Sequence, residues 1–441
     1  MINGILLLYY HPPVAYAPTV ADHVQAFSKY SQFKVWGVNT HYGYPKALDD
    51  FQFSIIVLHY SLFGSANYLL SSPFYRFLDR SQNSYKICTW QDECYNFKQR
   101  SQFLNTHKID CVYSCLQPKY YDKVYYSRCP SVKKVLPTLT GYVSESMLAK
   151  ARLFSKSYKQ RTTDVGYRAR EVPTYLGLGG LEKIEIAQQF LAHANGSNLN
   201  TDISYKEADR LYGDRYWKWL GDCKAILGAE SGGSIFDLEN EVWNEYHLRL
   251  GNKARIRNYM LPYDQMPPEL MQKWENVISY RAISPRYFEA SAFNICQVLY
   301  LGEYNGILKP WIHYLPLEKD FSNFHQIVGL MQSDMGQDVI KNAHTDIIES
   351  GKYTYQKFIE GFDEDLIKAG PSPSIETSEA DKVTKVIQSN LTSQRLRHLP
   401  ETLLYAAYYN QWLGKSLLIP MAQPLGQIYL RLRGYKKGVT R

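Results

Sequence analysis

The sequence lacks any apolar run long enough to cross a membrane as a helix. Such a helix needs about 20 consecutive apolar residues, and polar residues interrupt the runs here well before that length. The N-terminal stretch MINGILLLYYHPP also lacks the basic start and the small-residue cleavage site of a secretory signal. We therefore expect Ile5–Tyr10 to form a first buried strand and the protein to be cytoplasmic.

The sequence also lacks the cysteine spacing of a zinc site or a disulfide framework. Its seven cysteines are odd in number and include no C-x-x-C pair, which favours a reducing compartment. Charge of one sign is only weakly in excess, because 50 Lys and Arg stand against 42 Asp and Glu, a net charge of +8. An excess this small does not predict a nucleic-acid partner.

Acidic residues are absent after Glu401, and the stretch that follows mixes cations with aromatic residues such as Trp412. Two interpretations stay open for this tail, residues 396–441. A basic amphipathic segment can lie on an anionic membrane surface as a peripheral contact, or the segment can pack back on the first domain. The six cations are Lys415, Arg431, Arg433, Lys436, Lys437 and Arg441.

Tyrosine is present in surplus, with 38 copies among 441 residues. Its flat apolar ring and its hydroxyl suit a cleft that must be apolar and hydrogen-bonding at once, but the same count also fits a merely Tyr-rich lineage. The chain length favours two or three domains, since a single hydrophobic core seldom organises more than about 250 residues.

The first 150 residues alternate short apolar runs with longer amphipathic stretches, such as the expected helix Val20–Tyr30. This alternation predicts a parallel sheet covered by helices on both faces, and the continuous apolar run Ser54–Leu58 fits a strand buried on both sides. We expect this doubly wound α/β domain to span residues 1–155. Its strands are expected at Ile5–Tyr10, Phe33–Val38, Phe53–His59, Tyr85–Trp90, Cys111–Ser114 and Val132–Leu136.

The same alternation restarts after the basic stretch Lys150–Arg161 and predicts a second α/β domain over residues 160–395. Ligands of such sheets bind at the carboxyl ends of the strands, so two α/β domains in succession predict a cleft between two such edges. The strands are expected at Asp164–Arg168, Asp202–Ser204, Cys223–Leu227 and Ile295–Leu301, and the helices at Leu181–Ala194, Ser284–Phe293, Asn323–Glu349 and Thr354–Phe362.

The expected helix at Ser284–Phe293 carries a candidate binding group. Ser284 suits the N-cap and Pro285 the first turn, which places Arg286 and Glu289 inside the helix. A carboxylate at this place can accept both hydroxyls of a ribose in charge-assisted hydrogen bonds. The alternative is an ordinary capped helix with a solvated glutamate.

A strand, two cations and a glycine-rich turn follow one another from Asp164 to Gly180. Backbone N–H groups exposed by glycine, a helix N-terminus and nearby arginines can together bind a phosphate. Arg168, Arg170 and Lys183 are the candidate ligands, and alternation along the strand places Arg168 and Arg170 on one face. The alternative is a set of solvated or structural cations.

Polar groups also follow other predicted strands, where they are expected to face the cleft. Glu230 and Ser231 lie in a glycine turn after an apolar strand, a position that fits either a ligand contact or a solvent-facing turn. Carboxylates and histidine suit general acid–base work. The candidates are His59, Asp92, Glu93 and Tyr142 in the interdomain stretch. His59 equally fits a buried structural histidine. Because side chains alternate along a strand, only one of Asp92 and Glu93 is expected to point inward.

The stretch Ser284–Ala292, with the strand and the turns that follow it to Asn323, resembles the donor-binding helix region of the GT-B glycosyltransferases of the group 1-like type. The resemblance covers most of the chain and implies two Rossmann-like doubly wound domains that face each other across a cleft. One departure concerns Arg281. Many retaining members carry a second glutamate eight residues before the one that aligns with Glu289, and Arg281 occupies that position here.

The resemblance implies a glycosyltransferase that uses a nucleotide sugar and needs neither a metal nor another cofactor. In this interpretation the donor phosphate lies on the cations and the ribose or sugar hydroxyls lie on Glu289 and Glu230, while Asp92 or Glu93, assisted by His59, activates the acceptor. The donor-binding residues are Arg168, Arg170, Lys183, Glu230, Ser231, Ser284, Arg286 and Glu289, and the acceptor-side residues are His59, Asp92, Glu93 and Tyr142.

The same resemblance implies transfer with retention of the anomeric configuration to a polysaccharide or a lipid-linked glycan, at the inner face of a bacterial membrane. Two alternatives stay open. One is a transferase for a CMP-linked acidic sugar, similar to Kdo, that uses a carboxylate nucleophile. The other is a non-catalytic protein of the same fold that binds a glycan or a nucleotide.

Overall fold

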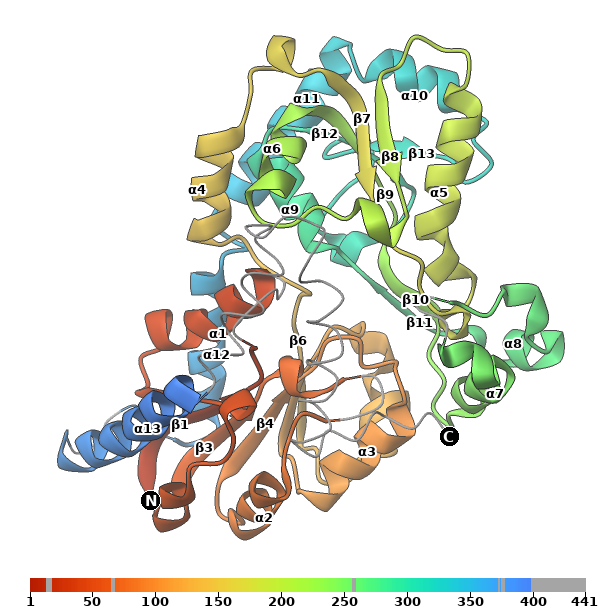
Figure 1. Cartoon of the computed structure of the whole chain (residues 1–441). Helices are drawn as coiled ribbons and strands as arrows, with labels where there is room; N and C mark the ends of the chain where they lie inside the picture. The colour runs from red at the N-terminus through yellow and green to blue at the C-terminus, as the bar shows by residue number, and fades with distance from the viewer. Residues whose placement is uncertain (13–17, 65–67, 256–258, 372, 374–376, 398–441) are drawn as a thin grey trace.

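The computed structural model describes residues 1–12, 18–64, 68–255, 259–371, 373 and 377–397, and it consists of two α/β domains, one above the other in Figure 1. The expected fold class is confirmed, because each domain is built on a parallel sheet of its own. The basic tail lies almost wholly outside the described residues, so both of its interpretations stay predictions. In the part of the chain that is described, no helix is both long and apolar enough to cross a bilayer.

The first domain contains a six-stranded parallel sheet with the strand order β2-β1-β3-β4-β5-β6. Every strand predicted for this domain is present to within three residues. The central strands of the sheet are short and almost wholly buried, because helices cover both faces of the sheet, whereas the two edge strands are partly exposed. The strands are β1 (Ile2–Tyr9), β2 (Val35–Asn39), β3 (Phe53–Leu58), β4 (Tyr85–Thr89), β5 (Cys111–Ser114) and β6 (Lys134–Pro137), and the helices that follow are α1 (Pro18–Tyr30), α2 (Ser72–Arg80) and α3 (Phe97–Thr106).

The second domain contains a five-stranded parallel sheet with the order β13-β12-β9-β7-β8. The carboxyl ends of its central strands point toward the first domain (Figure 1). Four of its strands were expected from the sequence, whereas β13, with three residues, is too short to give a periodic signal. The strands are β7 (Thr163–Arg168), β8 (Thr201–Ser204), β9 (Cys223–Gly228), β12 (Cys296–Tyr300) and β13 (Leu315–Leu317), and the helices are α5 (Leu178–Ala194), α6 (Asp214–Asp222), α9 (Pro285–Ala292), α10 (Phe324–Leu330) and α11 (Asp334–Ala343).

The chain returns to the first domain earlier than expected. Helix α12 (Tyr355–Lys368) packs along α1, and its Ile359 belongs to the same buried cluster as β1. Helix α13 (Thr377–Arg397) lies beside β2, where Trp36 Nε1 donates to Thr384 Oγ1 at 3.0 Å. Helix α12 and all but the last two residues of α13 fall within residues 160–395, the range predicted for the second domain. That boundary is therefore corrected, because an amphipathic helix does not reveal in its sequence which sheet it covers.

Two segments cross between the domains side by side. The first leads from β6 to α4 (Glu145–Phe154), and the second leads into α12. The Val143 N–H donates to the Tyr353 carbonyl at 2.8 Å, and the Tyr355 N–H donates to the Val143 carbonyl at 3.2 Å. These two hydrogen bonds fasten the crossing segments to each other.

An insertion in the second domain makes a second connection to the first, on the side away from α4 (Figure 1). Phe236 of the insertion packs edge-on against Phe97 of α3, with ring centroids 5.1 Å apart. Residues of the insertion and of the first domain form one buried apolar cluster, so the core of the first domain continues into the second. The insertion comprises the antiparallel strands β10 (Ser231–Ile235) and β11 (Glu275–Ala282) with α7 (Glu241–Leu250) and α8 (Pro268–Trp274) between them.

Candidate functional site

Four cations converge on the edge of the second domain that faces the first domain. Arg170 follows β7, Lys183 lies on α5, Arg281 lies on β11 and Arg286 lies in the first turn of α9. Burial lowers the pKa of Lys183 to about 8, although Asp92 of the first domain opposes the shift. The charges of Arg286, Arg170 and Arg281 lower this pKa further. Lys183 therefore lies within electrostatic reach of three other cations.

Among the described residues, part of this cation cluster has no hydrogen-bonded or ion-paired anion. Within the described residues, the side chains of Arg170 and Lys183 make neither a hydrogen bond nor an ion pair. Arg286 donates to the main-chain carbonyl of Arg168. Like charges held close together repel each other until an anion binds between them. This arrangement suits a ligand with several negative charges, such as a phosphate ester.

Asp92 faces the cation cluster from the first domain. It follows β4 in a turn with a left-handed φ of 56°, a conformation that aspartate tolerates better than most residues. Its N–H donates to Tyr280 Oη of β11 at 3.1 Å, so the second domain holds this turn. The Asp92 side chain is exposed, whereas the neighbouring Glu93 is buried.

Glu93 lies beneath the loop that follows β5. Its carboxylate accepts hydrogen bonds from Ser114 Oγ at 2.8 and 2.9 Å, from the Leu116 N–H at 3.1 Å and from the Tyr125 hydroxyl. Burial raises the pKa of Glu93 to about 7 against the effect of these hydrogen bonds. In this arrangement Glu93 holds the loop at the cleft edge and does not itself reach the cleft.

His59 is also fully buried. Its Nδ1 accepts from the Ser61 N–H at 3.1 Å, and its Nε2 lies 2.8 Å from Nδ1 of His23. Burial keeps the pKa of His59 well below its usual value, with the His23 ring acting in the same direction. A neutral histidine with both ring nitrogens engaged has the geometry of a structural residue, the alternative that the sequence left open.

Helix α9 places Glu289 near the cation cluster. Pro285 is its first residue, and Ser284 precedes it without a side-chain capping bond. Glu289 accepts a hydrogen bond from the Tyr216 hydroxyl of α6. Burial raises the pKa of Glu289, while that hydrogen bond and the charge of Arg286 act against the rise. Ser231, the first residue of β10, is half-buried and lies opposite Ala282 of β11.

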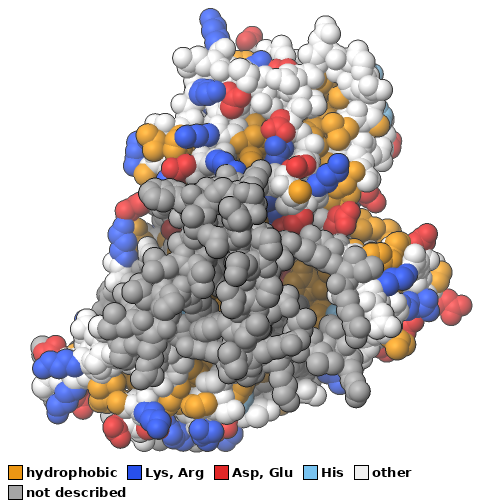
Figure 2. Space-filling model, viewed as in Figure 1, with side chains coloured by type: hydrophobic (Ala, Val, Ile, Leu, Met, Phe, Trp, Pro, Cys, Tyr) orange, Lys and Arg blue, Asp and Glu red, His pale blue; other side chains and the backbone are white. Residues whose placement is uncertain are grey.

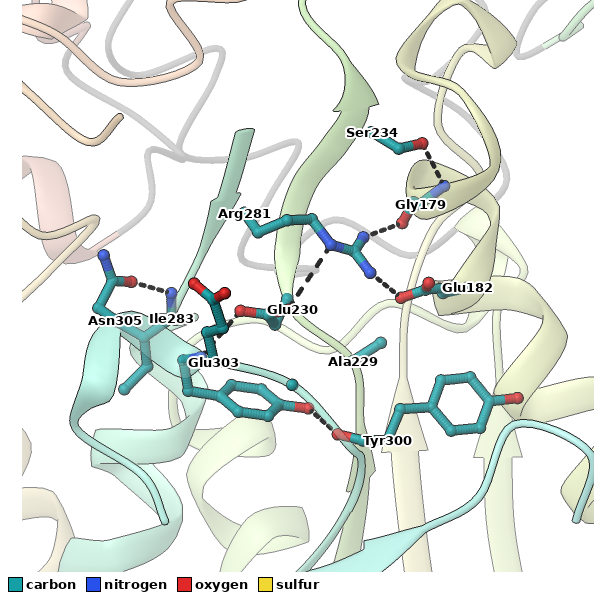
Figure 3. A network of polar contacts seen from close by, with 12 residues as sticks. Gly179, Glu182, Ala229, Glu230, Ser234, Arg281, Ile283, Tyr300, Glu303 and Asn305 are labelled. Atoms are coloured by element: carbon teal, nitrogen blue, oxygen red, sulfur yellow. Dashed lines mark hydrogen bonds and ion pairs between the residues drawn. The ribbon is translucent and has the colours of Figure 1, made fainter. Parts of the chain in front are cut away.

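Arg281 lies at the centre of a polar network beside the cation cluster (Figure 3). Its Nη1 donates to the Gly179 carbonyl at 2.7 Å, and its Nη2 pairs with Glu182. Its Nε lies 3.6 Å from Oε2 of Glu230. Glu182 also pairs with Lys319 Nζ at 2.7 Å. The sequence gives no signal for Glu182, because an acid beside a lysine on a helix resembles a solvated pair.

The glycine-rich turn serves this network, which corrects the expectation that its amides bind a phosphate. The Leu178 N–H donates to Glu275 Oε2 at 3.3 Å, and the Gly179 N–H donates to Ser234 Oγ at 2.7 Å. The first amides of α5 therefore already have acceptors. A Cβ atom on Gly179 would lie 2.5 Å from Nη1 of Arg281, so glycine is needed here for the close approach of the guanidinium.

Arg168 makes its contacts away from the cation cluster. Its Nη2 pairs with Asp202 Oδ1 at 2.7 Å, its Nε donates to the Asp209 carbonyl at 3.2 Å, and its guanidinium lies over the Trp219 ring at 4.9 Å. Strand β7 ends at Arg168, so the alternation that places Arg168 and Arg170 on one face does not extend to Arg170. Arg168 has the contacts of a structural cation, the alternative that the sequence left open.

A pocket of about 600 Å³ lies between the domains next to the Arg281 network. It is lined by the loops after β5 and β6 and by Glu303 and Asn305 of the second domain. Tyr142 also lines it, and the Tyr142 hydroxyl lies 3.0 Å from Thr138 Oγ1 and accepts from the Leu139 N–H at 3.0 Å. On the face shown in Figure 2, charged side chains gather on the lower rim of the second domain. No group of three His, Cys, Asp or Glu among the described residues is arranged as metal ligands.

No protein-family model and no curated protein sequence matches the chain. The chain is similar to a solved alpha-glucosyltransferase in complex with UDP and a 13-mer DNA, with a TM-score of 0.48, 9% identity, and coverage of 82% of this chain and 99% of that one. It is similar to sucrose-phosphate synthase from Thermosynechococcus elongatus, with a TM-score of 0.43, 10% identity, and coverage of 83% and 100%. It is also similar to TarM, with a TM-score of 0.36, 15% identity and 70% coverage, and here it spans about half, 53%, of the other chain.

Proposed function

We propose that this protein is a glycosyltransferase that transfers a sugar from a nucleotide-activated donor. The observation that carries the proposal is the cluster of Arg170, Lys183 and Arg286, which faces Asp92 across the two sheet edges. A nucleoside diphosphate supplies the negative charge that these cations lack. The resemblance of residues 284–323 to GT-B sequences supports the same function.

In the proposed donor site, Arg170, Lys183 and Arg286 bind the diphosphate. They stabilise the charge that develops on the phosphate as its bond to the anomeric carbon breaks, which is the principal electrostatic demand of the reaction. Glu289 on α9 is placed to accept hydrogen bonds from the ribose, and Glu230 from the donor sugar. The cations are already gathered at this edge before the ligand binds, as the charges acting on Lys183 show.

On the acceptor side we assign the proton-accepting role to Asp92. It is the exposed member of the Asp92–Glu93 pair, and it faces the cation cluster. A general base must lie within hydrogen-bond reach of the proton that it removes, which favours Asp92 over the buried Glu93 and His59. The pocket beside Tyr142 then receives the acceptor.

We further propose that the acceptor is a polysaccharide or a lipid-linked glycan, and that transfer retains the anomeric configuration without a bound metal. The neutral rim of the pocket, where Lys119 lies 4.0 Å from Glu303, supports an uncharged acceptor group. Peripheral membrane contact through the basic tail belongs to the same proposal.

The proposal is tested by thermal unfolding of the full chain with UDP, GDP, ADP, TDP or CMP. A ligand at 100 times its Kd adds about 2.7 kcal/mol of stability, so we expect one diphosphate to raise the Tm by several degrees. A rise with CMP alone would favour the CMP-sugar transferase instead. If no nucleotide raises the Tm, the proposed function is wrong. A rise without turnover of any nucleotide sugar would leave a non-catalytic binding protein.

A further inference from the structure

We propose that Arg281 is a positioning residue, whose guanidinium holds the Glu230 carboxylate and the first turn of α5 in one fixed arrangement so that Glu230 meets the donor sugar. This inference rests on the proposed function. Arg281 occupies the position where many similar retaining enzymes carry a glutamate. Its role is therefore argued from its own contacts and is not carried over from those enzymes.

The guanidinium of Arg281 joins elements that are distant in the sequence (Figure 3). Nη1 donates to Gly179 and Nη2 pairs with Glu182, both in the first turns of α5. A guanidinium is a rigid planar fork. Once two of its nitrogens hold α5, the direction of the third is fixed, and that nitrogen, Nε, faces Glu230, two residues after the end of β9. A lysine ammonium could not hold two directions in this way.

Glu230 retains capacity for another hydrogen-bond donor. Its Oε1 accepts from the Tyr304 N–H at 2.8 Å. Its Oε2 lies 3.6 Å from Nε of Arg281, which is beyond the length of a hydrogen bond. A Cβ atom on Gly302 would lie 2.8 Å from this oxygen, so glycine at this position leaves space beside Oε2 of the buried Glu230. A sugar hydroxyl is the kind of donor that this oxygen can accept.

The network is electrically balanced without the donor phosphate. Arg281 and Lys319 are paired with Glu182, and Glu230 supplies a second negative charge. Arg281 is therefore already engaged by carboxylates. The neighbouring Lys183, which has no such partner among the described residues, stays available for an anion. The two cations thus have separate roles. Arg281 orients the Glu230 carboxylate, and Lys183 binds the phosphate.

The test compares wild type, Arg281→Ala, Arg281→Lys, Glu230→Gln and the double variant Arg281→Ala/Glu230→Gln by calorimetric titration. The first probe is the nucleoside diphosphate that stabilises the protein most. The second probe is an ester of that diphosphate with glucose, galactose, N-acetylglucosamine or glucuronic acid, and it is the ester that wild type binds most tightly. We expect the affinity for the free nucleotide to change less than about threefold in all variants. The additional affinity due to the sugar should fall about tenfold in each single variant, the value of about one charged hydrogen bond, and no further in the double variant.

A pH series separates positioning from a purely structural role. Burial raises the pKa of Glu230, while the Tyr304 N–H and the Arg281 charge oppose the rise and Glu182 and Glu303 add to it. In wild type we expect the sugar-dependent affinity to fall as the pH is lowered and Glu230 takes up a proton, whereas in Arg281→Ala, where Glu230 no longer meets the sugar, the residual affinity should not depend on this protonation. Arg281→Lys, which keeps the charge but not the planar fork, should behave like Arg281→Ala.

Arg249→Ala is the matched control, since it removes another arginine paired with a glutamate, Glu245 on α7. It should leave the sugar-dependent affinity unchanged. If Arg281→Ala does not fold, Glu182→Gln serves instead, because it weakens the ion pair that holds the Arg281 guanidinium. This variant should lower the sugar-dependent affinity partially. An unchanged sugar effect in Arg281→Ala, independent losses in the double variant, or no sugar effect in wild type would overturn the inference. If no nucleotide binds wild type, the proposed function itself fails.

Discussion

At the scale of single residues, Lys183 and Arg168 are two cations with opposite electrostatic surroundings. Lys183 has a pKa lowered to about 8, and in the described part of the chain its side chain makes neither a hydrogen bond nor an ion pair. Arg168 is engaged by Asp202 and lies over the Trp219 ring. We infer that Lys183 serves a ligand and that Arg168 serves the fold.

We therefore expect Lys183→Ala to weaken nucleotide binding by tenfold to a hundredfold, because a hydrogen bond to a charged group contributes about 1.5–3 kcal/mol. Without ligand it should not lower the Tm, since it removes a buried, repelled charge. Arg168→Ala should lower the free energy of unfolding by about 1–3 kcal/mol and leave nucleotide affinity unchanged. Titration calorimetry and urea unfolding measure both effects, with Lys273→Ala, an exposed cation paired with Glu241, as the control. Equal losses of affinity in both variants would contradict this division.

Glu93 is the residue whose ionisation we expect to govern stability near neutral pH. Burial raises its pKa from 4.5 to about 7, so between these values the folded protein holds a proton that the unfolded chain releases. The contribution of Glu93 to stability should therefore fall by up to about 3 kcal/mol as the pH rises from 4.5 to 7 and should level off above that range, against the opposite contribution of buried histidines such as His59. Glu93→Gln has no proton to lose and should remove this slope. Urea unfolding of both proteins at pH 5, 6, 7 and 8 measures it, and an identical slope in both would refute the assignment.

At the scale of elements, β11 connects the two halves of the candidate site. Neighbouring side chains of a strand point to opposite faces, so Tyr280 reaches the Asp92 turn while Arg281 reaches α5 and Glu230. The next residue but one, Ile283, donates its N–H to Asn305, which lines the interdomain pocket. One short segment thus contacts the first domain, the donor-side helix and the pocket wall.

Tyr280→Phe isolates the acceptor side of this segment. The variant keeps the buried ring and removes only the oxygen that accepts the Asp92 N–H. We expect a loss of about 1–2 kcal/mol in the free energy of unfolding and an unchanged nucleotide affinity. The rate of donor hydrolysis, in which water replaces the acceptor, should fall about tenfold, equivalent to 1.4 kcal/mol. Tyr158→Phe is the control, because the Tyr158 hydroxyl donates to the Met331 carbonyl of the second domain at 3.5 Å. A full hydrolysis rate in Tyr280→Phe would separate Asp92 from the reaction.

The sequence predicts the elements that form because their side chains are buried, since burial leaves an apolar pattern in the sequence. Continuous apolar runs such as Ser54–Leu58 place the parallel strands, and strand ends place Asp92 and Glu230 near the cleft. Strand β10, with the sequence Ser-Gly-Gly-Ser-Ile, and β11, which carries Arg281, are polar because their side chains bind the first turns of α5 and Glu230. No periodicity indicates such strands. Glu182 is missed for the same reason, because its partners come from β11 and from the loop after β13.

At the scale of the whole molecule, the insertion holds the two domains together independently of the crossing segments. Phe236 lies within the buried cluster that also contains Phe97 of α3. At its rim the Lys98 N–H donates to Asn240 Oδ1 at 3.1 Å, and Arg128 pairs with Glu239 at 2.6 Å. A rigid-body opening of the cleft would expose this apolar surface, at a cost of about 25 cal/mol for each Å².

We therefore expect the domains to stay closed whether or not a nucleotide is bound. Small-angle X-ray scattering of wild type should give the same radius of gyration with and without the nucleotide, and calorimetry should show one cooperative unfolding transition. Phe236→Ala should lower the free energy of unfolding by about 3–5 kcal/mol through the cavity that it leaves, and it should introduce a measurable contraction on nucleotide binding. A contraction in wild type would show that the shared core opens during the cycle, and two separate transitions would show that the domains do not share a core. If wild type and Phe236→Ala both keep a constant radius, the crossing segments alone hold the domains closed.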